Sequence, residues 1–244
     1  LNVSYSCIGW LLHAVIELLL FADDTNVFLY DTHIHQLAVR AIRANDALSD
    51  INNWFKLNKL SVNVKKCNFI LFTTRSVTVS ADFKIIIDNI ELKRVRQTKF
   101  LGVIINEKLT WDDHISLLCN KVSKNIGILR RIKNKIPVSL LRNLYFMLIN
   151  PYFEYCNIIW AISSSAALVK LFRIQKRAIR LITNSEWNAH TAPLFRDMNI
   201  LTIYQLNLLH VASFMYKVHN NLLPQYFVDM FMSNYNVHSH NTRQ

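Results

Sequence analysis

The sequence predicts an α+β fold in which short strands and one helix come first and helices alone follow. Hydrophobic residues make up 52% of the 244-residue chain and charged residues only 18%, which excludes the disordered class. Only 3 glycines and 4 prolines occur, so most elements should run uninterrupted and the bulk should be helical. The spacing of apolar residues also changes near Trp111. We therefore expect a mixed region over 1–109, a basic helical region over 110–200 and a helical extension over 201–244.

The mixed region opens with a predicted β-hairpin. The stretch LLLFADDTNVFLY, from Leu18 to Tyr30, places the turn-forming letters DDTN between two apolar runs. From about Ile34 the apolar spacing changes to steps of four and three, which indicates one face of an amphipathic helix. The residues on that face are Leu37, Ala41, Ala44, Leu48, Ile51 and Phe55.

Short strands complete the mixed region. In Leu60–Phe72 apolar and polar residues alternate before the run becomes continuously apolar, which predicts a strand. Similar patterns predict short strands within Phe83–Val95 and Lys99–Trp111. Asn89 and Gly102 are the turn or bulge candidates of these segments.

Four helices are predicted in the second half. Apolar spacing marks the first over 115–129, preceded by the letters DDH, which suit a first turn. The second runs over 137–149, opened by one proline and followed by another. The third is predicted over 163–182 with a serine as N-cap, and the fourth over 201–219 with Thr202 placed to cap it.

Positive charge is concentrated in these helices. The chain has 28 Lys and Arg against 16 acids, a formal charge of +12. Residues 121–180 hold twelve of the basic residues and one acid, Glu154, so nearly the whole excess lies there. At about 100° per residue, the basic side chains span about 80° of the first helix and about 120° of the third. They are Lys121, Lys124, Arg131 and Lys135, then Lys170, Arg173, Lys176, Arg177 and Arg180.

Two explanations of this charge are open. Most charge runs are solvated helix faces, but here the acids needed for pairing along the helices are almost absent. A polyanionic partner, such as nucleic acid or an acidic membrane surface, would explain the excess. We expect nucleic acid, bound through its phosphates and without sequence preference.

The adjacent carboxylates Asp23 and Asp24 suggest a divalent cation. Mg²⁺ prefers oxygen ligands and commonly uses one or two carboxylates together with substrate phosphates. An ordinary Asp-Asp turn is the alternative, because turns favour aspartate. The cysteines show no zinc or disulfide spacing and indicate a reducing compartment; they are Cys7, Cys67, Cys119 and Cys156.

Six short motifs follow one another along the chain. They are FADDT (21–25), WFKLNKLSVNVKKCNFILF (54–72), TKFLGVIINEKLTWDDHI (98–115), LINPYFEYCNIIW (148–160), IQKRAIRLI (174–182) and AHTAPLF (189–195). In this order they resemble the C-terminal part of a reverse transcriptase from a jockey-like non-LTR retrotransposon. The resemblance covers essentially the entire chain, and each motif is specific only together with the others.

The resemblance implies a partial right-hand polymerase palm, made of β-hairpins with a helix, followed by an all-helical thumb and C-terminal region. It implies an RNA-directed DNA polymerase that extends a DNA primer on an RNA template, using deoxynucleotide triphosphates. Two ions of Mg²⁺ (or Mn²⁺) would support phosphoryl transfer in the complete enzyme. An RNA–DNA hybrid would be the nucleic-acid partner, tracked along its backbone.

Site residues follow from the same resemblance. Asp23 and Asp24 would be the catalytic metal ligands, and Lys66 would neutralise the departing pyrophosphate, with Lys65 competing for that role. The primer-positioning residues would be Phe100, Leu101 and Gly102.

The family's first catalytic aspartate motif and its glycine-rich motif have no counterpart before Asp23. Only twenty-two residues precede it, and Glu17 is their single acid. We therefore expect this chain alone to bind metal weakly and not to polymerise, with the upstream palm, the fingers and an endonuclease domain missing from it. A non-catalytic, basic nucleic-acid-binding module derived from the element is the alternative function.

No membrane partner is expected. The apolar stretch Cys7–Ala22 is shorter than the roughly 20 residues that a span needs, and it contains His13 and Glu17. We expect this stretch to be buried in the protein. The resemblance implies an intracellular location, in nucleus and cytoplasm, for the parent element.

Overall fold

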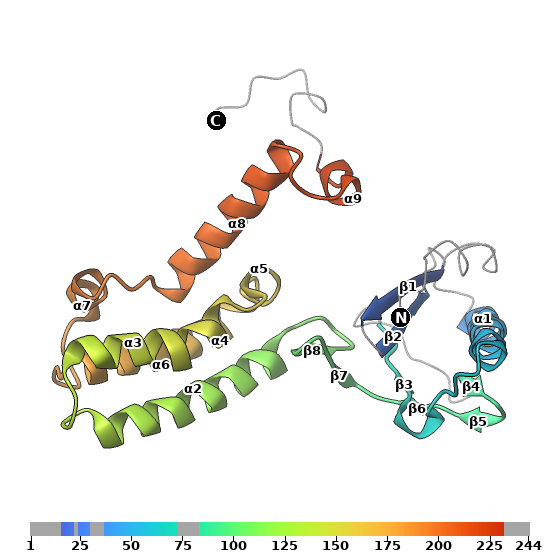
Figure 1. Ribbon diagram of the computed structural model, residues 1–244, viewed down its shortest axis with the longest axis horizontal. Helices are drawn as coiled ribbons and strands as arrows, with labels where there is room; N and C mark the ends of the chain where they lie inside the picture. Colours follow the sequence, from blue (N-terminus) through green and yellow to red (C-terminus); the bar gives the residue numbers. More distant parts are fainter. Residues whose placement is uncertain (1–15, 22–23, 30–36, 73–82, 232–244) are drawn as a thin grey trace. The chain divides into compact units, whose positions relative to one another are not determined.

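A computed structural model describes residues 16–21, 24–29, 37–72 and 83–231 (Figure 1). The chain divides into two compact units. Unit 1 consists of 1–98 with 106–109, and unit 2 consists of 99–105 with 110–244. The helices and small two-stranded sheets of these units are compatible with the predicted α+β class.

Unit 1 contains an antiparallel hairpin of β1 (Ile16–Phe21) and β2 (Asp24–Leu29). The predicted hairpin is confirmed, and its register places Phe21 opposite Asp24. The predicted DDTN turn is too long, because Asp24, Thr25 and Asn26 are already strand residues with partners on β1. Ladder pairing therefore outweighs the turn preference of these polar residues.

Helix α1 (Leu37–Leu57) packs on a small sheet in unit 1. Its buried face carries alanines, which let the backbone of the helix approach the sheet closely. The core formed there consists of Ala41, Ala44, Ile85, Ile87 and Leu92. Asn45 fixes the approach, because its amide donates to Lys84 O (3.2 Å) and accepts from Ile86 N (2.9 Å).

The sheets of unit 1 are short. Strands β4 (Ile86–Ile87) and β5 (Ile90–Glu91) form a hairpin around Asp88 and Asn89, whose φ values are 48° and 58°. Two positive φ values in a two-residue loop are typical of a type I′ turn, and the turn predicted at Asn89 is confirmed. Strand β6 (Lys93–Arg94) pairs in parallel with β3 (Asn68–Phe69).

The strand predicted over Leu60–Phe72 is wrong except at Asn68 and Phe69. A 3₁₀ turn, η2 (Val64–Lys66), lies where the alternating pattern was expected to pair. Val64, Cys67 and Phe69 instead pack against the α1 core, so their spacing reflects packing and not a ladder.

Strands β7 (Gln97–Phe100) and β8 (Val103–Asn106) form a hairpin joined by Leu101 and Gly102. Both linking residues have positive φ, 44° for Leu101 and 89° for Gly102. The turn predicted at Gly102 is confirmed.

Unit 2 is helical after the β7–β8 hairpin. Helices α2 (Asp112–Ile132), α3 (Val138–Leu148) and α6 (Ser165–Ile182) pack side by side (Figure 1). All three helices are confirmed, and their predicted ends differ from the observed ones by at most three residues, which is close to the usual uncertainty of helix ends. The core between them includes the fully buried side chains of Val122, Leu129, Tyr145, Leu171 and Ile179.

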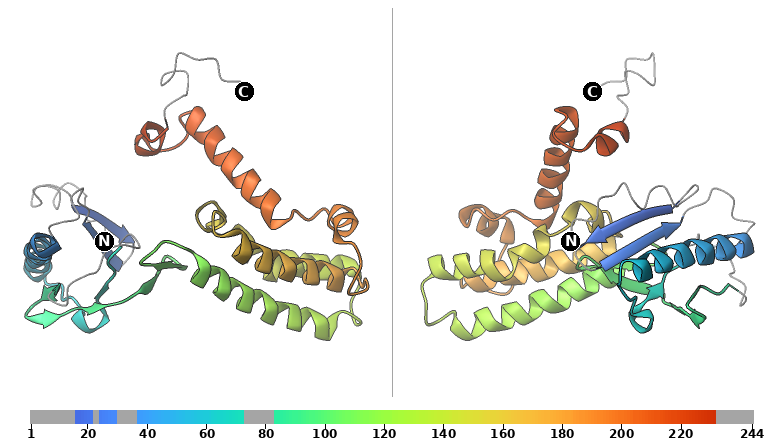
Figure 2. Two further views of the ribbon diagram at one scale, coloured as in Figure 1. Left: turned by 180° about the vertical axis from the view of Figure 1, so that it is seen from behind. Right: turned by 45° about the vertical axis from the view of Figure 1, so that its right-hand side comes forward.

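Shorter helices complete unit 2. They are α4 (Asn150–Glu154), α5 (Asn157–Trp160), α7 (Thr191–Asp197) and α9 (Gln225–Asp229). The predicted fourth helix is α8 (Ile203–His219), which Thr202 begins with a capping box that includes Gln205. Figure 2 shows α8 running out from the packed helices.

A buried glutamine joins α8 to this bundle. Gln175 donates to the Tyr145 hydroxyl (3.0 Å) and to Leu201 O (3.0 Å), and it accepts from Ile203 N (3.0 Å). Burial raises the pKa of Tyr145. No helix in the described part of the chain is long and apolar enough to cross a membrane.

Candidate functional site

Of the two predicted metal ligands, the structure describes the backbone position of Asp24 alone. Asp24 is the first residue of β2, and Asp23 lies outside the described residues. Phe21, opposite Asp24 in the register, is 61% exposed although it is a large apolar side chain. Unit 1 therefore leaves an apolar surface uncovered beside this carboxylate position.

Nothing among the described residues completes a metal site. They contain no group of three or more His, Cys, Asp or Glu residues placed to hold an ion. The expected Mg²⁺ site includes Asp23, which lies outside the described residues, and it stays a prediction.

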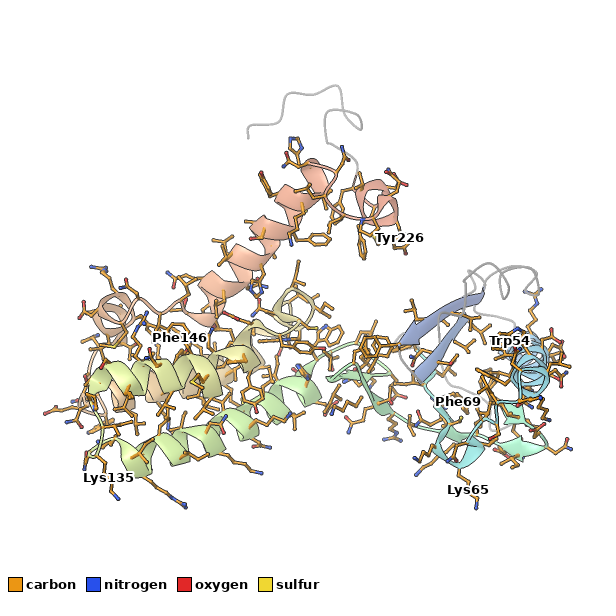
Figure 3. All side chains as sticks on the ribbon, in the orientation of Figure 1. Trp54, Lys65, Phe69, Lys135, Phe146 and Tyr226 are labelled. Atoms are coloured by element: carbon orange, nitrogen blue, oxygen red, sulfur yellow. The ribbon has the colours of Figure 1, made fainter. Side chains whose placement is uncertain are left out.

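The structure places Lys65 and Lys66 together on η2, and both side chains are exposed. Lys65 points away from the neighbouring strand (Figure 3). The 3₁₀ turn gives neither lysine a partner that would distinguish it, so the choice between them for the predicted role stays open.

The three predicted primer-positioning residues lie on the β7–β8 hairpin. Phe100 is the last residue of β7, and Leu101 and Gly102 form the turn. Within unit 2, Tyr155 holds this turn: its hydroxyl donates to Leu101 O, and its ring lies so close to Gly102 that an added Cβ would be 3.3 Å from Cε1. Sequence reasoning did not find Tyr155, since no local pattern links residues so far apart.

His114 holds the same hairpin from α2. Ile104 N donates to His114 Nδ1 (3.3 Å), so the ring is neutral and carries its proton on Nε2. That nitrogen is buried and finds no hydrogen-bond partner among the described residues. Burial lowers the pKa of His114, and the positive charge of Lys121 lowers it further.

A groove of about 530 Å³ lies between this hairpin and the helices of unit 2. Lys99 and Lys121 bring positive charge to it, and the Lys121 ammonium lies 5.5 Å from the centre of the Tyr152 ring. Apolar side chains form much of the remaining wall: Leu117, Leu118, Met147, Leu148 and Pro151. Cations and aromatic rings together suit an anionic group attached to a flat or apolar one.

The predicted basic residues lie on the solvent side of both helices. On α2 and α6 the buried residues centre on one side, and the basic arcs lie roughly opposite at about 100° per residue. Most of the nine side chains are exposed, and Lys121, Lys176 and Arg180 are partly buried. The charged residues of α6 are all basic, so none has an acidic partner within the helix.

The nine residues form two stripes, one along α2 and the residues just after it and one along α6. Lys121 approaches the Tyr152 ring on one side of α2. The charge of Lys170 acts on Cys119, whose pKa burial raises, and Cys119 lies about 160° around α2 from Lys121. Lys121 and Lys170 therefore lie on different sides of α2.

Two side chains of the α6 stripe also have local contacts. The Lys176 ammonium lies 4.4 Å from the centre of the Phe172 ring, and Arg180 Nε donates to Ala189 O (2.9 Å). Both cations can still bind a phosphate, because the ring contact of Lys176 and the single hydrogen bond of Arg180 leave further N–H donors on each side chain.

Comparison with known proteins finds similarity to RNA-directed DNA polymerases of mobile elements. The chain is 26% identical over 188 residues to a probable RNA-directed DNA polymerase from transposon X-element of Drosophila melanogaster, which covers 75% of this chain and 20% of that protein. It is 26% identical over 187 residues to the probable polymerase from transposon BS of the same species, with the same coverage.

The polymerase from mobile element jockey of Drosophila melanogaster is 22% identical over 186 residues, 74% of this chain and 19% of that protein. These matches confirm the predicted resemblance to jockey-like polymerases. The chain spans about a fifth of the length of the curated relatives it matches. No family model matches the chain. No solved structure matches it.

Proposed function

We propose that this chain is a part of an RNA-directed DNA polymerase of a jockey-like mobile element, comprising the end of the palm and the thumb. The observation that carries the proposal is the similarity to such polymerases over about three quarters of the chain. Unit 1 would then be the palm part and unit 2, with the β7–β8 turn, the thumb part.

In this proposal the β7–β8 turn supports a primer end. The turn is held by Tyr155 and backed by His114, and the groove beside it carries the Lys99 and Lys121 ammonium groups. A nucleic-acid strand offers the matching chemistry, because its phosphates pair with cations and its sugars and bases pack on apolar and aromatic side chains. Leu101 and Gly102 would contact the strand mainly through their backbone.

Catalysis would require the rest of the polymerase. Asp23 and Asp24 would hold Mg²⁺, which would neutralise phosphate charge during phosphoryl transfer, and Lys66 would stand near the departing pyrophosphate. The resemblance calls for a further catalytic aspartate before Asp23, and residues 1–22 contain a single acid, Glu17, so we propose that the 244-residue chain alone does not polymerise.

Primer extension tests the proposal. Poly(rA) with oligo(dT), Mg²⁺ and dTTP is incubated with the 244-residue chain and, in parallel, with a longer polypeptide that restores the upstream region. We expect extension by the longer polypeptide, none by the short chain, and loss of extension in the longer one after Asp23→Asn with Asp24→Asn. Extension by the short chain would refute the proposed inactivity of that chain. Unimpaired extension by the double variant would refute the metal-binding role of Asp23 and Asp24.

A basic nucleic-acid-binding module without catalysis is the second candidate, favoured by the acid-free basic stripe of α6. It predicts that the longer polypeptide also fails to extend a primer, while hybrid binding persists. Asp23→Asn with Asp24→Asn would leave that binding unchanged, because neither carboxylate belongs to the basic stripes.

A further inference from the structure

The segment between α6 and α7 carries Trp187, whose side chain is 86% exposed, the highest value among the large hydrophobic side chains of the described chain. An isolated exposed apolar residue needs no explanation, but tryptophan has the largest apolar surface to bury and is usually well covered. Trp160 is fully buried, and Trp54 and Trp111 are partly buried. Trp187 therefore differs from the other tryptophans of the described chain in leaving most of its indole open to solvent.

Two cations hold the segment that carries Trp187. Arg180 Nε donates to Ala189 O (2.9 Å), and Lys133 Nζ, at the end of α2, donates to Asn184 Oδ1 (3.0 Å). Ser185 N also donates to Arg180 O (2.9 Å), which extends the helical turn into the segment. The indole is thus displayed from an anchored backbone, which lowers the ordering entropy that a ligand would have to overcome.

The C-terminal ends of α2 and α6 meet at this segment. Lys133 contacts Asn184 at one end, while the charge of Lys170 reaches Cys119 near the other, so the two helices run in parallel. The last residues of the two helices and the residues just after α2 carry six basic side chains, and the segment itself adds one acid, Glu186. The basic residues are Arg130, Arg131, Lys133, Lys135, Arg177 and Arg180; Figure 3 shows Lys135 at this end. We call this surface, with Trp187, the Trp187 end.

The helix dipole explains only part of this charge. Cations are favourable in the last turn of a helix, and this applies to Arg130, Arg131 and Arg180. Lys135 lies beyond the end of α2, and the dipole gives no reason for an uncovered indole. An open aromatic face near cations is the arrangement that binds unpaired bases by stacking and their phosphates by charge.

We propose that the Trp187 end binds single-stranded nucleic acid, with one base stacked on the indole and neighbouring phosphates on the surrounding lysines and arginines. A duplex offers no free base face except at its ends, so the indole selects for unpaired strands. The site is separate from the β7–β8 turn, because the helix from His114 to Lys133 spans roughly 28 Å. The proposal goes beyond the polymerase function and does not require it.

Fluorescence anisotropy tests the proposal with labelled oligo(dT), oligo(rU) and a blunt DNA duplex of the same length, at one low salt concentration. Trp187→Ala should weaken binding of both single strands by roughly 5- to 100-fold, the range that base stacking supplies, and change duplex binding less than about twofold. Trp187→Phe should retain most of the affinity because it keeps an aromatic face. Leu57→Ala is the matched control, since Leu57 is 84% exposed but lies on α1.

Equal single-strand affinities of Trp187→Ala and the unchanged chain would overturn the proposal. An equal loss on single strands and duplex would also overturn it, since the indole would then contribute to binding without selecting unpaired bases. Primer extension by the longer polypeptide is scored separately. Failure there, with the Trp187→Ala result intact, would reject the polymerase function and leave the single-strand site standing.

Discussion

Gly102 illustrates how strongly a single residue of the candidate site is constrained. Its φ of 89° is in the left-handed region, and an added Cβ would lie 3.3 Å from the Tyr155 ring. Gly102→Ala should therefore lower the free energy of unfolding by about 1–2 kcal/mol, measured by urea denaturation.

Gly127 gives a matched control for that substitution. It lies within α2, and a Cβ added there meets nothing within 4 Å. Gly127→Ala should raise the free energy of unfolding by up to about 1 kcal/mol, because alanine is the better helix former. The two substitutions are thus expected to have opposite signs, and a stabilised Gly102→Ala variant would show that the turn is not fixed as described.

His114 should make stability depend on pH. Burial and the charge of Lys121 lower its pKa in the folded protein from the ordinary value of 6.5. Above that ordinary value both states are neutral and stability is unaffected. As the pH falls below it, the unfolded chain takes up a proton that the folded protein rejects, so stability is lost at up to about 1.4 kcal/mol per pH unit.

Urea denaturation at pH 7.5 and 5.5 checks this prediction in the unchanged chain and in His114→Gln. Glutamine can still accept the hydrogen bond from Ile104 N but does not titrate. The drop in stability between the two pH values should therefore be smaller in His114→Gln. An equal drop would mean that other groups carry the dependence.

The residues around the β7–β8 turn show which parts of the candidate site could be predicted from the sequence and which could not. The turn at Gly102 was predictable because glycine between two apolar runs has a local conformational meaning. Tyr155 and His114 were not, because their roles arise only when distant segments pack, and neither contact leaves a sequence pattern. Asp23 and Asp24 were found by motif alone, and the described residues add a hairpin position for Asp24.

Helices and strands differ in how much of them could be predicted. The α2, α3, α6 and α8 predictions hold because each helix carries its own apolar spacing and, in α6 and α8, a capping Ser164 or Thr202. The strand predicted over Leu60–Phe72 is wrong because two-residue ladders such as β3–β6 depend on tertiary contacts. Alternation in that stretch was produced by side chains packing on α1.

The basic stripe of α6 gives a prediction for one element. If Arg173 and Arg177 each neutralise a phosphate, Arg173→Gln and Arg177→Gln should each make the slope of log K against log salt shallower by about one, for an RNA–DNA hybrid. Lys84→Gln is the control, because Lys84 already pairs with Glu91 (3.3 Å). Unchanged slopes in both arginine variants would assign the stripe to ordinary solvation.

The whole molecule exposes apolar surface in both units. Unit 1 leaves Leu19 and Phe21 uncovered on its hairpin. In unit 2, exposed apolar side chains recur along α8 at helical spacing and form a stripe of Tyr204, Leu208, Val211 and Met215. A continuous exposed apolar stripe is typical of a contact surface, so we infer that this stripe drives self-association of the chain.

Sedimentation velocity over a range of concentrations tests that inference. The 244-residue chain should self-associate as concentration rises, because uncovered apolar stripes bury surface by pairing with one another. Leu208→Lys with Met215→Lys should shift the population toward monomer, since lysine in an apolar contact must be desolvated. Ile162→Lys is the control: Ile162 is 73% exposed but lies outside the stripe, and it should leave the distribution unchanged. A chain that stays monomeric at every concentration would show that the exposed stripe is too small or too irregular to drive association.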